Sequence, residues 1–193
     1  FLTACATLPK TPPSLSPEQL YLKGIYAIEK GKPREALTWF ERTEQEYPYS
    51  NWATEAQLMQ LFCHYSLTDY VTTIAQSDNF ILNHPINPHL DYVYYLKAVS
   101  YYDQIMPVTQ DQTNTKEALA ALQTVVAIFP GTAYAKDAQV KIDLAYDHLA
   151  AHEMSIGRFY QHRGHLPAAL RRYSQVIENY DTTPQIAEAL FRM

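Results

Sequence analysis

Glycine, cysteine and net positive charge are all scarce in this chain of 193 residues. Its five glycines stand apart, so no glycine-rich loop brings the backbone close to a phosphate, which disfavours Rossmann and P-loop enzymes. Fifteen Lys and Arg against twenty Asp and Glu give a formal net charge of −5, which disfavours a nucleic-acid binder. Two cysteines, Cys5 and Cys63, do not make a disulfide framework. No apolar run reaches the roughly 18 residues of a membrane-spanning helix.

The beginning of the chain is typical of an exported protein. Residues 1–5 read as the end of a signal peptide, and Leu2-Thr3-Ala4-Cys5 is similar to the bacterial lipobox, in which the cysteine is lipidated. Residues 6–16, rich in Pro, Thr and Ser, are expected to form an extended tether behind a lipid anchor on Cys5. Ala6 stands where lipoproteins retained in the inner membrane have Asp. The pattern therefore predicts a lipoprotein on the periplasmic face of the outer membrane of a Gram-negative bacterium; a signal-peptide remnant with a chance cysteine is the alternative.

The remainder, residues 17–193, is predicted to be one all-α domain. Its apolar residues recur every three or four positions, as Ala118, Leu122 and Val125 do, which is the helical period. Isolated glycines followed by prolines mark turns between helices. The polar stretch 106–115 is expected to be an extended loop between helices. From 132 to 163 the helical pattern is long, and a break near 148–153 is an open alternative that no Gly or Pro marks.

Internal repeats with a fixed spacing organise these helices. In two hairpins a glycine is followed by alanine after twelve residues and by an aromatic residue after sixteen: Gly24, Ala36 and Phe40, then Gly157, Ala169 and Tyr173. Small residues let two helices approach closely, and the aromatic residue fills the wedge toward the next hairpin. The spacing predicts a TPR-like α-solenoid of about five helical hairpins, the last incomplete, with a generic helical bundle as the alternative.

Several further segments are more specific than the repeat spacing. The clearest is the pair Phe80–Pro85 and Asp91–Lys97, which generic TPRs lack. Glu46–Pro48, Ala133–Ala138 and Gly157–Tyr160 add to it. Together with the lipobox, these segments resemble the BamD (ComL, YfiO) family of TPR lipoproteins of the outer-membrane β-barrel assembly (BAM) machine. The resemblance covers nearly the whole chain, although the 106–115 loop is shorter than in some relatives.

The resemblance implies a scaffold and no enzyme. Such proteins dock on a POTRA domain of BamA, contact other Bam lipoproteins and bind the C-terminal segments of unfolded outer-membrane proteins. A TPR groove suits an extended or helical peptide. The alternative is another periplasmic TPR lipoprotein that scaffolds cell-wall or cell-division enzymes. A helical hydrolase is weaker still, because the sequence shows no convergent polar cluster.

Two groups of residues are the candidate binding sites. Aromatic rings suit aromatic client termini, so we expect a client-peptide groove to draw on aromatic residues of the first two units: Tyr21, Tyr47, Tyr49, Trp52 and Tyr65. Their alternative role is core packing. The resemblance implies a BamA-docking surface around the last hairpin, comprising Tyr160, Arg163 and Arg172. A solvated helix face is the alternative for these arginines.

Two other features suggest chemistry only at first sight. His148 and His152 have the i, i+4 spacing of a zinc pair, but the sequence offers no third ligand at a matching distance. Cys63 lies in an apolar helix, where a buried and inert thiol is expected. We therefore predict no metal and no cofactor other than the covalent lipid.

Overall fold

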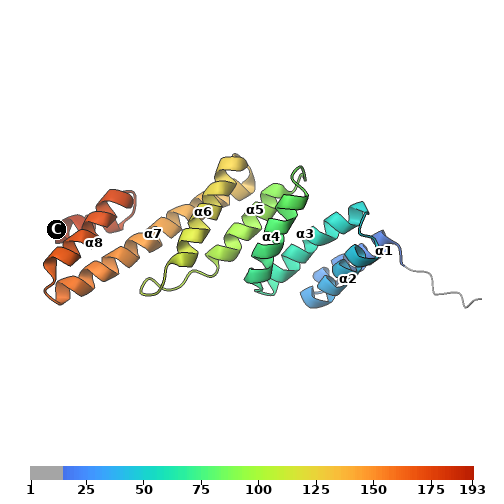
Figure 1. The fold of residues 1–193 in the computed structure, drawn as a ribbon, viewed down its shortest axis with the longest axis horizontal. Coiled ribbons are helices and arrows are strands. Elements are labelled where there is room, and N and C mark those ends of the chain that lie inside the picture. The colour runs from blue at the N-terminus through green and yellow to red at the C-terminus, as the bar shows by residue number, and fades with distance from the viewer. Residues whose placement is uncertain (1–14) are drawn as a thin grey trace, which may run out of the picture. The chain divides into compact units, whose positions relative to one another are not determined.

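A computed structural model describes residues 15–193, and Cys5, the lipobox and most of the tether lie outside the described residues. The described residues form nine helices: α1 (Pro17–Glu29), α2 (Pro33–Glu46), α3 (Asn51–Ser66), α4 (Tyr70–Asn83), α5 (Leu90–Tyr102), α6 (Thr113–Ile128), α7 (Ala133–His162), α8 (Leu166–Asn179) and α9 (Gln185–Arg192). The predicted all-α class is confirmed (Figure 1). Within residues 15–193, no helix is both long enough and apolar enough to span a bilayer.

The helix ends follow from local chemistry. Ser16 caps α1 through a capping box with Gln19, and Pro17 occupies the first turn, where a missing N–H costs nothing. Asp69 caps α4, because its side chain accepts a hydrogen bond from the backbone N–H of Thr72. Gly31 and Gly164 have φ values of +69° and +75°, a backbone conformation that ordinary side chains rarely adopt. The two Gly-Pro turns of the sequence are therefore built as predicted.

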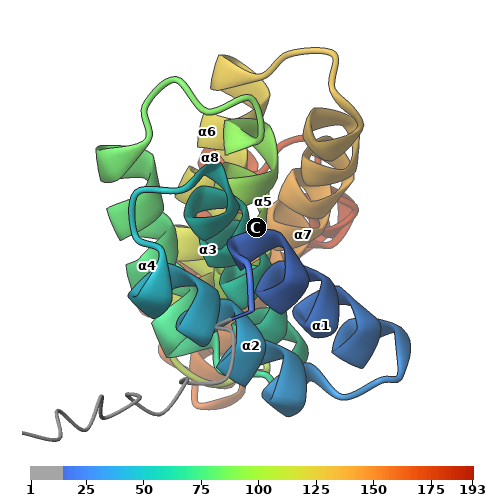
Figure 2. The same ribbon diagram turned by 90° about the vertical axis from the view of Figure 1, so that its right-hand side faces the viewer.

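The chain divides into two compact units, and the first of these contains α1, α2 and α3. Helix α2 packs against both α1 and α3, as Figure 2 shows. The ring of Phe40 is completely buried and faces Gly24, where an added Cβ would lie 2.4 Å from Cε1 of the ring. Gly24 is thus small because the Phe40 ring occupies the space beside it.

The second unit contains α4 to α9, each packed against the next along the chain. Helix α7 is unbroken over 30 residues, so the break left open near residues 148–153 does not occur. Beyond its sequential neighbours α6 and α8, it also contacts α5 and α9. This long helix is therefore the shared support of the second unit.

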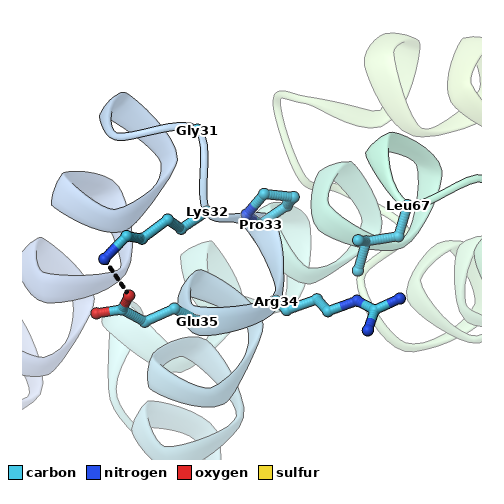
Figure 3. Close-up of a pocket in the computed structure, with 6 residues that line it drawn as sticks. All are labelled: Gly31, Lys32, Pro33, Arg34, Glu35 and Leu67. Carbon is cyan, nitrogen blue, oxygen red and sulfur yellow. Dashed lines mark ion pairs between the residues drawn. The ribbon is translucent and has the colours of Figure 1, made fainter.

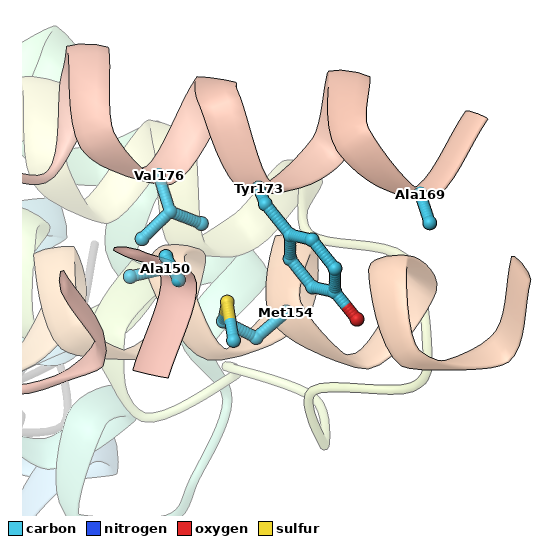
Figure 4. Packing of buried hydrophobic residues seen from close by; sticks show 6 residues of the cluster. Ala150, Met154, Ala169, Tyr173 and Val176 are labelled. Atoms are coloured by element: carbon cyan, nitrogen blue, oxygen red, sulfur yellow. The ribbon is translucent and has the colours of Figure 1, made fainter. Parts of the chain in front are cut away.

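The end of the second unit repeats the packing of the first. On α8, buried Tyr173 lies over Met154 of α7 and Val176 lies over Ala150, as Figure 4 shows. An added Cβ at Gly157 would lie 2.4 Å from Cε1 of the Tyr173 ring. Ala169, one turn before Tyr173, completes the close contact between α7 and α8. The glycine, alanine and aromatic spacing in the sequence therefore has the same packing role in both hairpins.

The loop predicted over 106–115 is shorter than expected, because α6 begins at Thr113. It joins α5 to α6 and is fastened to α7 by two histidine rings. His148 Nε2 lies 2.8 Å from the Met106 carbonyl oxygen, and His152 Nδ1 lies 2.5 Å from that of Val108. Their i, i+4 spacing places both rings on one side of α7, where they bond to the loop backbone.

Candidate functional site

The first candidate surface lies in the first unit, where α1 and α3 begin. Tyr21 and Trp52 pack with their ring centroids 5.0 Å apart. Tyr21 also contacts Phe40 at 5.4 Å, so it joins the surface ring of Trp52 to the buried core. Burial, and secondarily the carboxylate of Glu55, raise the pKa of Tyr21. These half-buried rings form an aromatic surface with one acidic group beside it.

Tyr47 and Tyr49 lie in the turn from α2 to α3, at the same end of the unit. The Tyr47 hydroxyl donates a 2.8 Å hydrogen bond to the carbonyl oxygen of Leu15, which fastens the segment before α1 to the end of α2. Tyr49 is fully exposed and contributes nothing to the core. The predicted groove residues at this end thus include one structural anchor and one accessible ring.

Tyr65 is separated from the other four. It stands near the end of α3, thirteen positions after Trp52, which is about 20 Å along the helix and about 140° around its axis. Tyr65 is therefore not part of the Tyr21–Trp52 surface, a separation that a list of aromatic residues does not reveal.

The end of the unit that carries Tyr65 has an open pocket of about 420 Å³. Its lining comes from the α1–α2 turn and the residue after α3: Gly31, Lys32, Pro33, Arg34, Glu35 and Leu67. Figure 3 shows Lys32 paired with Glu35, at 3.1 Å, on one side of Pro33, and Arg34 directed to the other side near Leu67. In the sequence, Gly31–Pro33 indicated only a turn between helices, and the adjoining charges of Arg34 and Glu35 were the signal for a surface feature.

The second candidate surface lies around the end of α7 and the adjoining α8. Tyr160 packs against the core cluster of this hairpin and meets the His165 ring edge-on, at 6.4 Å. Arg163, which follows α7, places its guanidinium 4.7 Å from the ring centre of Phe159. Phe159 is half exposed, so this cation–π pair is accessible to a partner.

Arg172 joins this surface through a carboxylate on α7. Its Nη1 donates to Oε2 of Glu153 at 2.8 Å. Glu153 and Tyr160 are seven residues apart, two helical turns, and therefore lie on the same face of α7. The structure thus places Arg172 over the face that carries Tyr160, whereas the sequence indicated neither the Glu153 partner nor this shared face.

Arg158 belongs to a different face of α7, turned toward α9. Its Nη1 donates to both carboxylate oxygens of Glu188, at 3.1 and 3.0 Å. Arg192 donates to the same carboxylate from Nε at 2.6 Å and to the Gln161 amide oxygen from Nη1 at 2.9 Å. These bonds lower the pKa of Glu188, the Arg192 bond most strongly. This network holds α9 against α7.

Residues 15–193 offer no group of three or more His, Cys, Asp or Glu side chains that could hold a metal ion. His148 and His152 each use a ring nitrogen to bind the α5–α6 loop. Cys63 is buried, and burial raises the pKa of its thiol to about 12, so it is almost entirely protonated near neutral pH. Neither group is arranged for chemistry, and the two surfaces above are the candidate sites.

Comparison with known sequences points to one family. Residues 13–193 match the family described as YfiO: Outer membrane lipoprotein. A relative from Caulobacter vibrioides, named outer membrane protein assembly factor BamD, is 43% identical over 176 residues, which are 91% of this chain and 58% of the relative. The protein of that name from Rickettsia prowazekii is 39% identical over 90% of this chain and 69% of its own length. The chain therefore spans less than two thirds of the Caulobacter relative.

Comparison with solved structures supports the fold alone. A thermophilic TPR protein from Thermus thermophilus is similar with a TM-score of 0.50 at 16% identity, over 91% of this chain and 98% of the other. The predicted TPR-like class of sequential helical hairpins is thereby confirmed.

Proposed function

The chain belongs to the YfiO family of outer membrane lipoproteins, and from this premise we propose that it is a non-enzymatic scaffold of the machinery that assembles outer-membrane β-barrel proteins. The observation that carries the proposal is its 43% identity, over 91% of the chain, to an outer membrane protein assembly factor. The family also confirms the resemblance and the outer-membrane location predicted from the sequence. Lipidation of Cys5 is part of the proposal.

The second surface, around Tyr160, Arg163 and Arg172, is proposed to dock on a POTRA domain of BamA. Its chemistry supports this role, because a guanidinium presents N–H donors in a fixed fork that matches a carboxylate. The Arg172 side chain is 36% exposed, so a partner can reach it without unfolding the hairpin. Tyr160 adds a half-buried ring beside the charge, a combination enriched in interfaces.

The first surface is proposed to receive the aromatic C-terminal segments of unfolded outer-membrane proteins. Tyr21 and Trp52 support this role, since two adjacent rings offer both stacking and edge contacts to an incoming aromatic residue. Tyr49 lies at the same end and is free of core packing. Tyr47 and Tyr65 remain proposed members of the groove, although Tyr47 has a structural bond and Tyr65 lies at the far end of α3.

The docking proposal is tested by titrating the purified chain with the periplasmic POTRA region of BamA. We expect Arg172→Glu to weaken the affinity about tenfold or more, because it places a carboxylate where the proposed partner carboxylate binds. Arg171→Glu is the matched control, since it makes the same charge change at the adjacent, exposed position. Equal affinities for the two variants would contradict the assigned docking surface.

The client groove is tested with a peptide that ends in the C-terminal strand of an outer-membrane β-barrel protein. We expect Trp52→Ala to weaken peptide binding and Tyr26→Ala to leave it unchanged, since Tyr26 is 61% exposed on another face of α1. Trp52→Ala combined with Tyr65→Ala tests the complete predicted set. Undiminished peptide binding by that double variant would exclude the groove.

A capture experiment separates the proposed function from the cell-wall alternative. The lipidated protein, recovered from detergent-solubilised membranes, is expected to bring down a POTRA-containing barrel protein and other Bam lipoproteins. Recovery of peptidoglycan enzymes without the barrel protein would move the function to cell-wall scaffolding and leave the fold and the family unchanged.

A further inference from the structure

One ion pair within the proposed docking surface is neither part of the buried core nor a contact with the proposed partner. The Glu153 carboxylate on α7 and the Arg172 guanidinium on α8 are 2.8 Å apart. Glu153 is 19% exposed, whereas Arg172 is 36% exposed, so the acidic group lies deeper than the basic one. The guanidinium is therefore the more accessible member of the pair, and the carboxylate is the more buried one.

The bonds of Arg172 are confined to one corner of its guanidinium. Nη1 donates to Glu153 at 2.8 Å and has a longer contact, at 3.4 Å, with the side-chain oxygen of Gln175. Across residues 15–193, no hydrogen bond or ion pair involves its Nε or Nη2. Three of the five N–H donors of this side chain are thus available to a second carboxylate.

The carboxylate lies on a face of α7 whose other residues pack against neighbouring helices. Tyr146, Glu153 and Tyr160 are spaced by seven residues, so they follow one face of α7. The Tyr146 ring packs against Tyr180 at 6.2 Å, and its hydroxyl accepts a 3.0 Å hydrogen bond from Gln123 of α6. Burial, and secondarily the charge of Glu153, raise the pKa of Tyr180. Glu153 thus lies in a row whose neighbours are anchored to α6 and α8.

We propose that Glu153 is a positioning residue of the docking surface: it fixes the Arg172 guanidinium in one orientation, so that the partner carboxylate meets a preformed fork of N–H donors. This inference rests on the proposed docking function. The physical reason is preorganisation, since a free arginine side chain samples many rotamers and loses them on binding. With Glu153 in place, that ordering has already occurred in the unbound protein.

A double-mutant cycle on the full chain tests the proposal, with the POTRA region of BamA as the probe. We expect Glu153→Ala to weaken binding about threefold to tenfold when Arg172 is present, and to have no further effect in the Arg172→Ala background. Glu153→Gln, which retains an acceptor oxygen without the charge, should restore part of the affinity. Glu178→Ala removes an exposed carboxylate from α8 as the matched control. Thermal unfolding of each variant separates loss of binding from loss of fold.

The outcomes are distinct. Additive effects of Glu153→Ala and Arg172→Ala would show that Glu153 acts independently of the arginine and would overturn the proposal. Tighter binding by Glu153→Ala would overturn it as well, by showing that the carboxylate competes with the partner. If Arg172→Ala leaves the affinity unchanged, the proposed docking surface fails. If Arg172→Ala weakens binding and Glu153→Ala does not, only the proposed role of Glu153 fails.

Discussion

The α1–α2 hairpin and the α7–α8 hairpin use the same spacing and complete it differently. In each, a glycine faces an aromatic ring sixteen residues later, and an added Cβ would lie 2.4 Å from that ring. In the first hairpin the ring is Phe40, whose aromatic neighbour is Tyr21. In the second it is Tyr173, whose hydroxyl donates a 2.8 Å hydrogen bond to Gln161.

The difference lies four residues after the glycine, where the first hairpin has Ile28 and the second has Gln161. Ile28 packs against the apolar cluster around Phe40. Gln161 accepts from Tyr173 and also from Arg192 of α9. One TPR position thus closes an apolar core in one hairpin and joins the next helix through polar bonds in the other.

The largest expected effect comes from removing the rings. We expect Phe40→Ala and Tyr173→Ala each to lower the free energy of unfolding by about 3–5 kcal/mol, because each leaves a cavity that rigid helices cannot close. Hydrogen exchange resolved by peptide measures the loss separately in residues 15–67 and 68–193. Val71→Ala, at a position 74% exposed, should change little and serves as the control. Loss confined to 68–193 in the Phe40 variant would contradict the independent role of its hairpin.

Replacing a helical glycine by alanine gives the next largest effect, and here it is expected to destabilise the fold. Glycine to alanine inside a helix normally stabilises it by about 1 kcal/mol. At Gly24 and Gly157 we expect the opposite, a loss of about 1–3 kcal/mol in denaturant unfolding, because the new methyl group meets a buried ring. Phe40→Leu should partly rescue Gly24→Ala by vacating that space. A stabilised Gly24→Ala protein would show that the ring moves aside without cost.

Exchanging the hydroxyl between the hairpins tests their difference directly. We expect Phe40→Tyr to cost about 1–3 kcal/mol, because its hydroxyl would face Ile28 without a partner. Ile28→Gln should recover part of that loss in the double variant, since glutamine stands at the matching place in the second hairpin. The reciprocal change Tyr173→Phe removes one hydrogen bond and should cost about 1 kcal/mol. Denaturant unfolding measures the free energy of unfolding of all three variants. If Phe40→Tyr and Tyr173→Phe cost the same and Ile28→Gln recovers nothing, the two hairpins do not differ in the way described.

The sequence predicted the parts of the fold that depend on local spacing. Gly24 with Phe40 and Gly157 with Tyr173 indicated close helix pairs, and Gly31 and Gly164 indicated the turns, because these are requirements of neighbouring turns of one hairpin. The continuity of α7 through 148–153 was open, since its stability comes from contacts with four other helices that periodicity does not encode.

The candidate surfaces were less accessible to sequence reasoning. Composition identified Tyr21 and Trp52 as candidates but not their contact, and it grouped them with Tyr65 at the far end of α3. The pairing of Arg172 with Glu153 joins residues nineteen positions apart on different helices, so only the packing of α7 on α8 reveals it. Lateral contacts of this kind depend on helix rotation, which a single sequence does not fix.

The smallest expected effect concerns pH and α9. Hydrogen bonds from Arg192 first, and from Arg158, hold the pKa of Glu188 below its ordinary value of 4.5. A carboxylate with a lowered pKa in the folded protein stabilises it above that ordinary value, and the stabilisation is lost as the pH falls through the folded pKa. We therefore expect α9 to loosen below about pH 4.5, before the first hairpin, whose Phe40–Tyr21 contact has no group that titrates there.

Backbone chemical shifts recorded by NMR between about pH 6 and pH 3 follow α9 and the α1–α2 hairpin in the same sample. The loosening of α9 should be modest, because Glu188 and both arginines are about one third exposed and water screens such pairs. Glu188→Gln should remove the acid-dependent step, since an amide does not titrate. Persistence of the step in that variant would assign it to another carboxylate, and simultaneous loosening of the first hairpin would show that the two hairpins respond to acid in the same way.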